Sequence, residues 1–169
     1  MTAYVVRTKS LGVAFLLILS GMASLPITQA FGDEFDPYIK VQMGDYYYEV
    51  KGIDQGTPLR VKAGQIFWIV LENTGTSEHS ISLGRNPRYD EKVLADNGYR
   101  ENLLEKVQVE VQGENWHLVA NGLPYIHIDP GQEVELEITL PAEVIGEWEM
   151  GCFISPSYQN GMHLKFIVE

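Results

Sequence analysis

Short runs in which apolar and polar residues alternate recur along most of the chain. In the clearest run, residues 134–140, valine, leucine and isoleucine alternate with glutamate and threonine. A period of two is typical of a half-buried β-strand, because successive side chains point to opposite faces. Residues 107–111 show the same alternation, whereas residues 66–71 are apolar on both faces. The latter pattern predicts a strand at the centre of a sheet.

Turn signals separate these runs from further short segments of strand composition. Gly44-Asp45 and the triplet at 129–131, Asp-Pro-Gly, are the plainest turns. Residues 84–104 form an excursion of mixed polarity, in which we expect a helical turn around residues 91–95. Many short strands and almost no helical period predict an all-β fold, either a sandwich or a barrel. The further strand candidates are residues 38–43, 46–50, 59–61, 79–83, 116–120 and 125–128.

The N-terminal segment has a composition of its own. Arg7 and Lys9 precede an apolar stretch over residues 11–22, and small residues follow it. This order predicts a secretory signal peptide over residues 1–30, followed by one domain over residues 31–169. An uncleaved N-terminal anchor is the alternative, but the apolar stretch is short for a bilayer span. We therefore expect export to the periplasm and no stable membrane insertion after cleavage.

The chain is strongly acidic, with 23 Asp and Glu against 12 Lys and Arg and a formal net charge of −11. The signal segment holds two basic residues and no acidic ones, so the exported domain is more acidic still. Such a surface repels nucleic acid and anionic lipid, which we therefore exclude as partners. It favours docking to a positively charged redox protein such as a cytochrome, although acidic surfaces also serve solubility.

Cys152 is the only cysteine, so the chain cannot form an internal disulfide. In an exported protein a lone cysteine is a free thiol, an intermolecular link, a metal ligand or a buried apolar residue. Strand patterns end near Cys152 and resume near Met162. The two residues are therefore expected at the facing ends of two strands. A thiolate and a thioether brought together favour a soft metal, copper above all.

Residues 152–162 resemble the copper loop of the cupredoxins, the small blue-copper electron carriers. The family pattern is a cysteine, four residues, a histidine, four residues and a methionine. Cys152 and Met162 match this pattern, Ser157 occupies the position of the histidine, and His79 corresponds to the upstream histidine ligand. Residues 97–104 and 146–153 resemble bacterial exported cupredoxins, including acidophile copper proteins associated with a cytochrome oxidase.

The resemblance implies a Greek-key β-sandwich and one copper ion held by His79, Cys152 and Met162. It also implies that Ser80 occupies a position whose polar side chain ties the two ligand-bearing segments together. Because Ser157 is a poor copper ligand, three interpretations stay open. The site holds copper with three ligands, with or without water in the gap, another histidine such as His163 swings in, or copper binding is weak or lost.

The remaining candidate ligands are less favoured. His163 directly follows Met162, and adjacent residues of a strand point to opposite faces. His117 and His127 belong to middle strands, where solvated or structural roles are expected. Tyr158 offers a phenolate only with strong assistance from the metal, because the ordinary pKa of tyrosine is near 10.

These patterns favour an exported copper protein that carries single electrons between respiratory partners such as a cytochrome or cytochrome oxidase. One alternative is a protein that handles or delivers Cu(I), because soft sulfur ligands suit this ion. The other is a metal-free scaffold for interactions. We expect no enzyme, because the sequence has no Ser-His-Asp arrangement, no paired-carboxylate motif and no phosphate-binding glycine loop.

Overall fold

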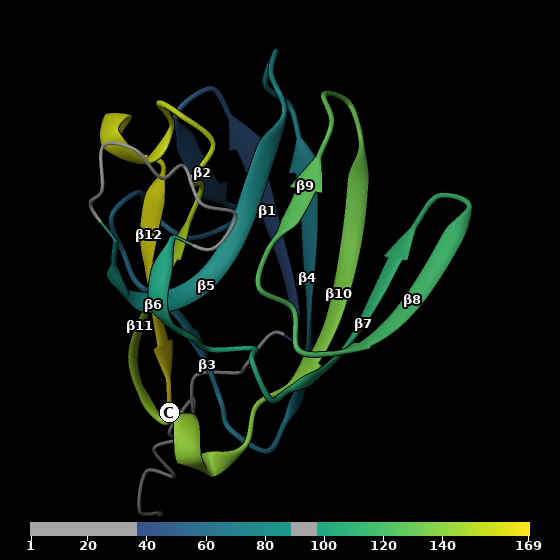
Figure 1. Cartoon of the computed structure of the whole chain (residues 1–169), viewed down its shortest axis with the longest axis vertical. Coiled ribbons are helices and arrows are strands. Elements are labelled where there is room, and N and C mark those ends of the chain that lie inside the picture. Colours follow the sequence, from purple (N-terminus) through teal and green to yellow (C-terminus); the bar gives the residue numbers. More distant parts are fainter. Residues whose placement is uncertain (1–36, 89–97) are drawn as a thin grey trace, which may run out of the picture. The chain divides into compact units, whose positions relative to one another are not determined.

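The computed structural model describes residues 37–88 and 98–169, and nearly all of its regular elements are β-strands (Figure 1). Two short 3-10 helices, η1 (Ala142–Val144) and η2 (Tyr158–Asn160), interrupt them. Neither helix of this described part is long or apolar enough to cross a bilayer. The strands are β1 (Tyr38–Gly44), β2 (Tyr47–Val50), β3 (Leu59–Val61), β4 (Ile66–Asn73), β5 (His79–Pro87), β6 (Tyr99–Asn102), β7 (Gln108–Gly113), β8 (Trp116–Asn121), β9 (Ile126–Ile128), β10 (Glu133–Thr139), β11 (Gly146–Gly151) and β12 (His163–Val168).

The strands form two sheets that pack as a β-sandwich (Figure 1). One sheet has the order β2-β1-β4-β10-β7-β8, and the other has the order β3-β12-β11-β5-β6, with β9 paired to β5. The chain crosses between the sheets after β2, β3, β4, β6, β8, β9 and β10, so that strands adjacent in sequence are often separated in space. The prediction of an all-β Greek-key sandwich is confirmed.

Strand β4 lies at the centre of its sheet, as its apolar sequence predicted. It pairs with β1 in parallel and with β10 in antiparallel orientation. Phe67, Ile69 and Leu71 alternate along it and are fully buried between the sheets. On the outer face Trp68 is half-buried, because its ring stacks on Tyr38 and its indole N–H donates to a carboxylate oxygen of β10. This shielding accounts for an apolar residue on a solvent-facing side.

The excursion over residues 84–104 contains more strand than its mixed polarity predicted. Strand β5 continues to Pro87, and β6 pairs with it antiparallel, with Gly84 opposite Asn102. Glycine permits this approach, because a Cβ at Gly84 would lie 2.5 Å from the backbone oxygen of Glu101. Charge also holds the pair, since the Nε of Arg85 donates to Glu101 at 2.6 Å. Such long-range pairs between polar strands leave no hydrophobic period in the sequence.

Strands β11 and β12 close the chain and place the cysteine and methionine of the loop between them. The two strands pair antiparallel, with Gly151 opposite His163. Cys152 and Met162 therefore flank the loop at the end of this ladder, as the sequence predicted. The predicted signal peptide over residues 1–30 and the helical turn around residues 91–95 lie outside the described residues.

Candidate metal centre

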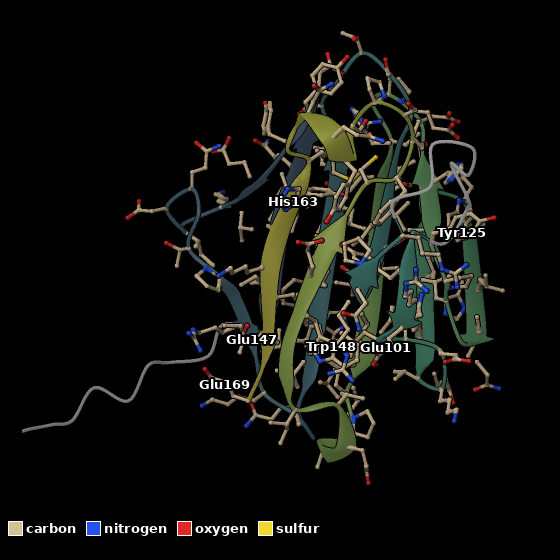
Figure 2. All side chains as sticks on the ribbon, turned by 60° about the vertical axis from the view of Figure 1, so that its left-hand side comes forward. Glu101, Tyr125, Glu147, Trp148, His163 and Glu169 are labelled. Carbon is tan, nitrogen blue, oxygen red and sulfur yellow. The ribbon has the colours of Figure 1, made fainter. Side chains whose placement is uncertain are left out.

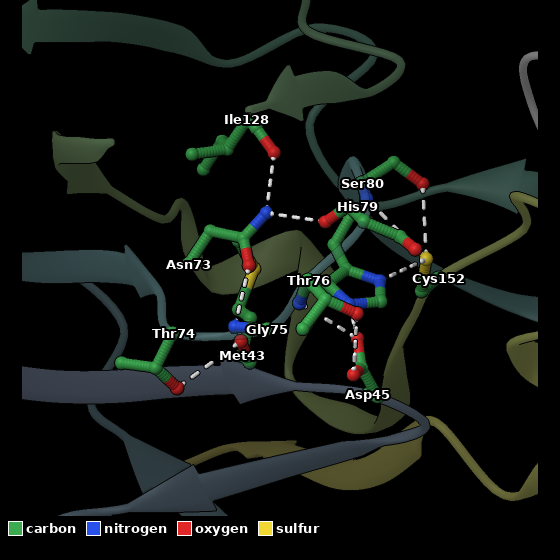
Figure 3. A network of polar contacts seen from close by, with 11 residues as sticks. Met43, Asp45, Asn73, Thr74, Gly75, Thr76, His79, Ser80, Ile128 and Cys152 are labelled. Carbon is green, nitrogen blue, oxygen red and sulfur yellow. Dashed lines mark hydrogen bonds and ion pairs between the residues drawn. The ribbon is translucent and has the colours of Figure 1, made fainter. Parts of the chain in front are cut away.

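His79 and Cys152 meet at one end of the sandwich, where β5 begins and β11 has just ended. The imidazole Nδ1 of His79 lies 3.9 Å from the Sγ of Cys152, and both side chains are buried (Figure 3). Bonds from zinc to imidazole nitrogen and to thiolate sulfur measure about 2.0 Å and about 2.3 Å. The two donors are thus close enough to contact one metal ion of similar size.

Ser80 holds the sulfur from the side of β5. Its backbone N–H donates to the Sγ of Cys152 at 3.3 Å, and its hydroxyl lies 3.6 Å from the same sulfur. The hydroxyl of Tyr48 in turn donates to the carbonyl oxygen of Ser80 at 2.6 Å. Burial, and secondarily the sulfur of Cys152, raises the pKa of Tyr48 well above its ordinary value, so this donor keeps its proton. Ser80 thus ties the two segments together, as the resemblance implied.

The loop from Cys152 to Met162 closes on itself through main-chain hydrogen bonds. The backbone N–H of Cys152 donates to the carbonyl of Met162 at 3.1 Å, and that of Met162 donates to the carbonyl of Ser157 at 3.0 Å. Gly161 ends η2 with a φ of 99°, a left-handed conformation that glycine adopts without strain. The loop backbone is therefore held independently of any metal.

The structure places two of the predicted ligands next to each other and buries the third. His79 and Cys152 are adjacent, and the side chain of Met162 is fully buried in the same core. Ser157 is buried within the loop, with 4% of its surface exposed. Among residues 37–88 and 98–169, no group of three or more His, Cys, Asp or Glu side chains is arranged to hold a metal. An imidazole, a thiol and a thioether form a donor set that fits copper.

The other histidines face away from the sulfur. His163 is 42% exposed, its Nδ1 lies 3.3 Å from Glu149, and Figure 2 shows it at the loop end of β12. His117 and His127 are exposed and pair with glutamates of neighbouring segments. This arrangement agrees with the strand argument that adjacent residues point to opposite faces. It also agrees with the solvated roles expected for His117 and His127.

A carboxylate and aromatic cluster supports the loop from outside the sulfur site. The hydroxyls of Tyr99 and Tyr158 both donate to Glu149, at 2.8 Å and 2.7 Å. The ring of Tyr158 stacks between Phe153 and His163, with centroids 4.6 Å and 4.8 Å away. Burial raises the pKa of Tyr99 far above its ordinary value, and the charge of Glu149 raises it further. Because its hydroxyl donates to Glu149 and its ring is stacked on both sides, Tyr158 anchors the loop.

Sequence reasoning missed a residue that holds the segment before the upstream histidine. Asn73 ends β4, is fully buried and bridges three segments. Its side-chain amide donates to the carbonyls of Ser77 and Ile128, and its oxygen accepts the backbone N–H of Gly75. Its only sequence signal is an asparagine followed by Thr-Gly, which is equally typical of an ordinary turn.

The sandwich has counterparts among solved structures. No family model and no curated protein sequence matches the chain. One counterpart is a dithionite-reduced auracyanin from the photosynthetic bacterium Roseiflexus castenholzii, which is 18% identical in sequence with a TM-score of 0.50. The match covers 79% of this chain and 98% of the auracyanin. Another is a Cu-containing nitrite reductase from Thermus scotoductus, which is 13% identical with a TM-score of 0.54. That match covers 78% of this chain and 30% of the reductase.

A third counterpart is a multicopper oxidase from Campylobacter jejuni, which is 14% identical with a TM-score of 0.51. That match covers 82% of this chain but only 31% of the oxidase. The chain therefore spans nearly all of the auracyanin and about a third of the oxidase and the reductase. At these identities the likeness is one of architecture, and the fold of this chain is cupredoxin-like.

Proposed function

We propose that this protein binds one copper ion between His79, Cys152 and Met162 and carries single electrons between protein partners. The observation that carries the proposal is the pair formed by the imidazole Nδ1 and the Sγ, buried 3.9 Å apart at one end of the sandwich. Bound copper would supply the one-electron couple. The cupredoxin-like fold supports the proposal, because this end of the fold brings the two donors together.

The chain itself would contribute three things to such a site. The backbone N–H of Ser80 points at the sulfur and stabilises negative charge on it, as a hydrogen bond to a thiolate does. Burial of His79 and Cys152 keeps water from the donors. The closed hydrogen-bonded loop holds Met162 in place without the metal. Fixed donors limit the rearrangement that accompanies a change of charge.

A second candidate function is the handling or delivery of Cu(I). Ser157 favours it, because serine at that loop position removes one imidazole that would help to hold Cu(II). The remaining set is richer in sulfur, and sulfur ligands suit Cu(I). In both candidates the acidic surface favours a basic protein partner, such as a cytochrome, in the periplasm, and the protein itself performs no bond chemistry.

Copper titration of the purified exported domain separates these candidates. An intense visible band on addition of Cu(II) indicates a thiolate–copper bond and supports the electron carrier. Tight Cu(I) binding without a Cu(II) band supports copper handling. Failure to bind either ion would overturn both copper proposals and leave an interaction scaffold.

The substitution Ser157→His tests whether the loop position still faces the site. We expect Cu(II) affinity to rise about tenfold or more, which corresponds to about 1.4 kcal/mol from the added imidazole. The backbone of Ser157 is held by main-chain bonds to Ile154 and Met162, so the loop should keep its form. The larger side chain in a buried position should cost about 1–3 kcal/mol of stability. Absorption and electron spin resonance spectra during a Cu(II) titration measure the effect.

The matched control for this variant is Ser155→His, which adds an imidazole at an exposed position of the same loop. It should leave the Cu(II) affinity and the spectrum unchanged. Equal affinities for the two variants would show that position 157 does not face the metal.

A further inference from the structure

The far ring nitrogen of His79, Nε2, is the buried side-chain nitrogen or oxygen without a hydrogen-bond partner in the described part of the chain. This Nε2 lies on the side of the ring opposite the sulfur, and the residue is only 2% exposed. A buried nitrogen left without a partner costs about 1–3 kcal/mol, so its surroundings bear on how the ring is held.

Asp45 faces this nitrogen from the turn between β1 and β2. Its Oδ1 lies 3.4 Å from the Nε2 of His79, slightly beyond a hydrogen bond, and Figure 3 shows the two side chains pointing toward one another. The carboxylate is aimed by Thr76, whose backbone N–H donates to Oδ1 at 3.0 Å and whose hydroxyl donates to Oδ2 at 2.9 Å. These two bonds lower the pKa of Asp45, so the group is a carboxylate at neutral pH.

Gly75 keeps the space between the two groups open. A Cβ at this position would lie 2.7 Å from the Oδ1 of Asp45 and 2.8 Å from the Nε2 of His79. Its backbone N–H is bound by Asn73 and by the carbonyl of Met43, so the turn is held against β1. Any larger residue would therefore separate the carboxylate from the imidazole.

We propose that Asp45 is a positioning residue for the candidate metal centre. Its carboxylate accepts the Nε2–H of His79 and so fixes the tautomer whose Nδ1 lone pair faces the sulfur of Cys152. A shift of about half an ångström brings the pair from its present separation to an ordinary hydrogen-bond distance of about 2.9 Å. The role of the pair in metal binding rests on the proposed function, whereas the tautomer itself is a property of the metal-free protein.

The chemical consequence is a preorganised and more basic ligand. A neutral imidazole carries one proton, and the hydrogen bond made by one nitrogen decides that the other is free to bind a metal. A carboxylate on the distal N–H also strengthens the donor atom, and loss of such a partner typically lowers metal affinity by about 10- to 100-fold. The same effect is expected here if Asp45 acts through His79.

The test is the protonation of the two ring nitrogens of His79 in the metal-free protein, read from long-range ¹H–¹⁵N correlation spectra where imidazole is neutral. The wild-type protein should carry its proton on Nε2. Asp45→Ala should shift the population toward the Nδ1–H form and lower Cu(I) affinity by about 10- to 100-fold. Asp45→Asn keeps an acceptor oxygen and should retain the wild-type tautomer with an intermediate affinity.

Two further variants keep the test decisive. Gly75→Ala keeps the side chains of Asp45 and His79 but places a methyl group between them. It should therefore reproduce the tautomer shift of Asp45→Ala, and it does so without removing the carboxylate that holds the turn. Glu78→Gln makes the same change in net charge as Asp45→Asn one residue from His79, and its carboxylate faces His127 instead. It should change neither the tautomer nor the affinity.

The outcomes separate this inference from the proposed function. A proton on Nδ1 in the wild-type protein, or an unchanged tautomer in both Asp45→Ala and Gly75→Ala, would overturn the role of Asp45 whatever copper does. A tautomer that depends on Asp45 in a protein that binds no copper would support the positioning role and overturn the proposed function.

Discussion

Replacing Cys152 with serine should abolish the visible copper absorption of the protein completely. The band arises from charge transfer between a thiolate and copper, and Cys152 is the only cysteine in the chain. The serine hydroxyl is nearly isosteric, so the hydrogen bond from the backbone of Ser80 has an acceptor in the variant as well. Absorption spectra of both proteins after addition of Cu(II) measure the effect.

Met162→Leu is the control for this variant, because it removes the thioether and keeps the thiolate. An axial thioether binds copper weakly and at long distance, so its loss should shift the reduction potential and leave a visible band. Leucine has a similar volume and suits the fully buried position. Equal loss of the band in the two variants would contradict the separate roles assigned to the thiolate and the thioether.

Phe166→Ala should lower the free energy of unfolding by about 3–5 kcal/mol. Phe166 lies on β12, is fully buried, and contacts Phe67 of the opposite sheet with ring centroids 6.5 Å apart. Removing the ring leaves a cavity between the two sheets that the close-packed core fills only in part. Denaturant unfolding followed by circular dichroism should show a lower midpoint with an unchanged slope.

The control for the core is Ile145→Ala. Ile145 is 56% exposed in the described structure, so the loss of its side chain should change stability by about 0.5 kcal/mol or less. A similar destabilisation by both variants would mean that the contact between the sheets does not dominate the stability of the sandwich.

Local patterns predicted most of the strands because one face of each strand is buried. The alternation at residues 134–140 became β10, whose Val134, Leu136 and Ile138 face the core. The apolar run at residues 66–71 became the central β4. By contrast, three of the four residues of β6 are polar and two are exposed, and its close approach to β5 depends on Gly84. Its pairing is a long-range contact that no local period records.

The residues of the candidate metal centre also fall into those that the sequence indicated and those that it did not. The spacing of Cys152 and Met162 and the strand patterns around them placed both residues at the ends of paired strands, and the resemblance singled out His79. The role of these residues as copper ligands stays a prediction, as do the signal peptide and the periplasmic location. Sequence reasoning did not single out Asp45, Asn73 or Glu149 for the support of the site.

Residue type and spacing alone predicted the strands with a buried face and the soft donors of one loop, because burial and ligand chemistry depend on them. Which groups surround those donors becomes apparent only in the folded chain. Asp45 lies 34 positions before His79 and Glu149 lies 50 after Tyr99 in the sequence, yet each pair is in contact. The first contact joins segments of the two sheets and the second joins two strands of one sheet. Both depend on how distant strands come together, and that depends on the summed packing of the whole core.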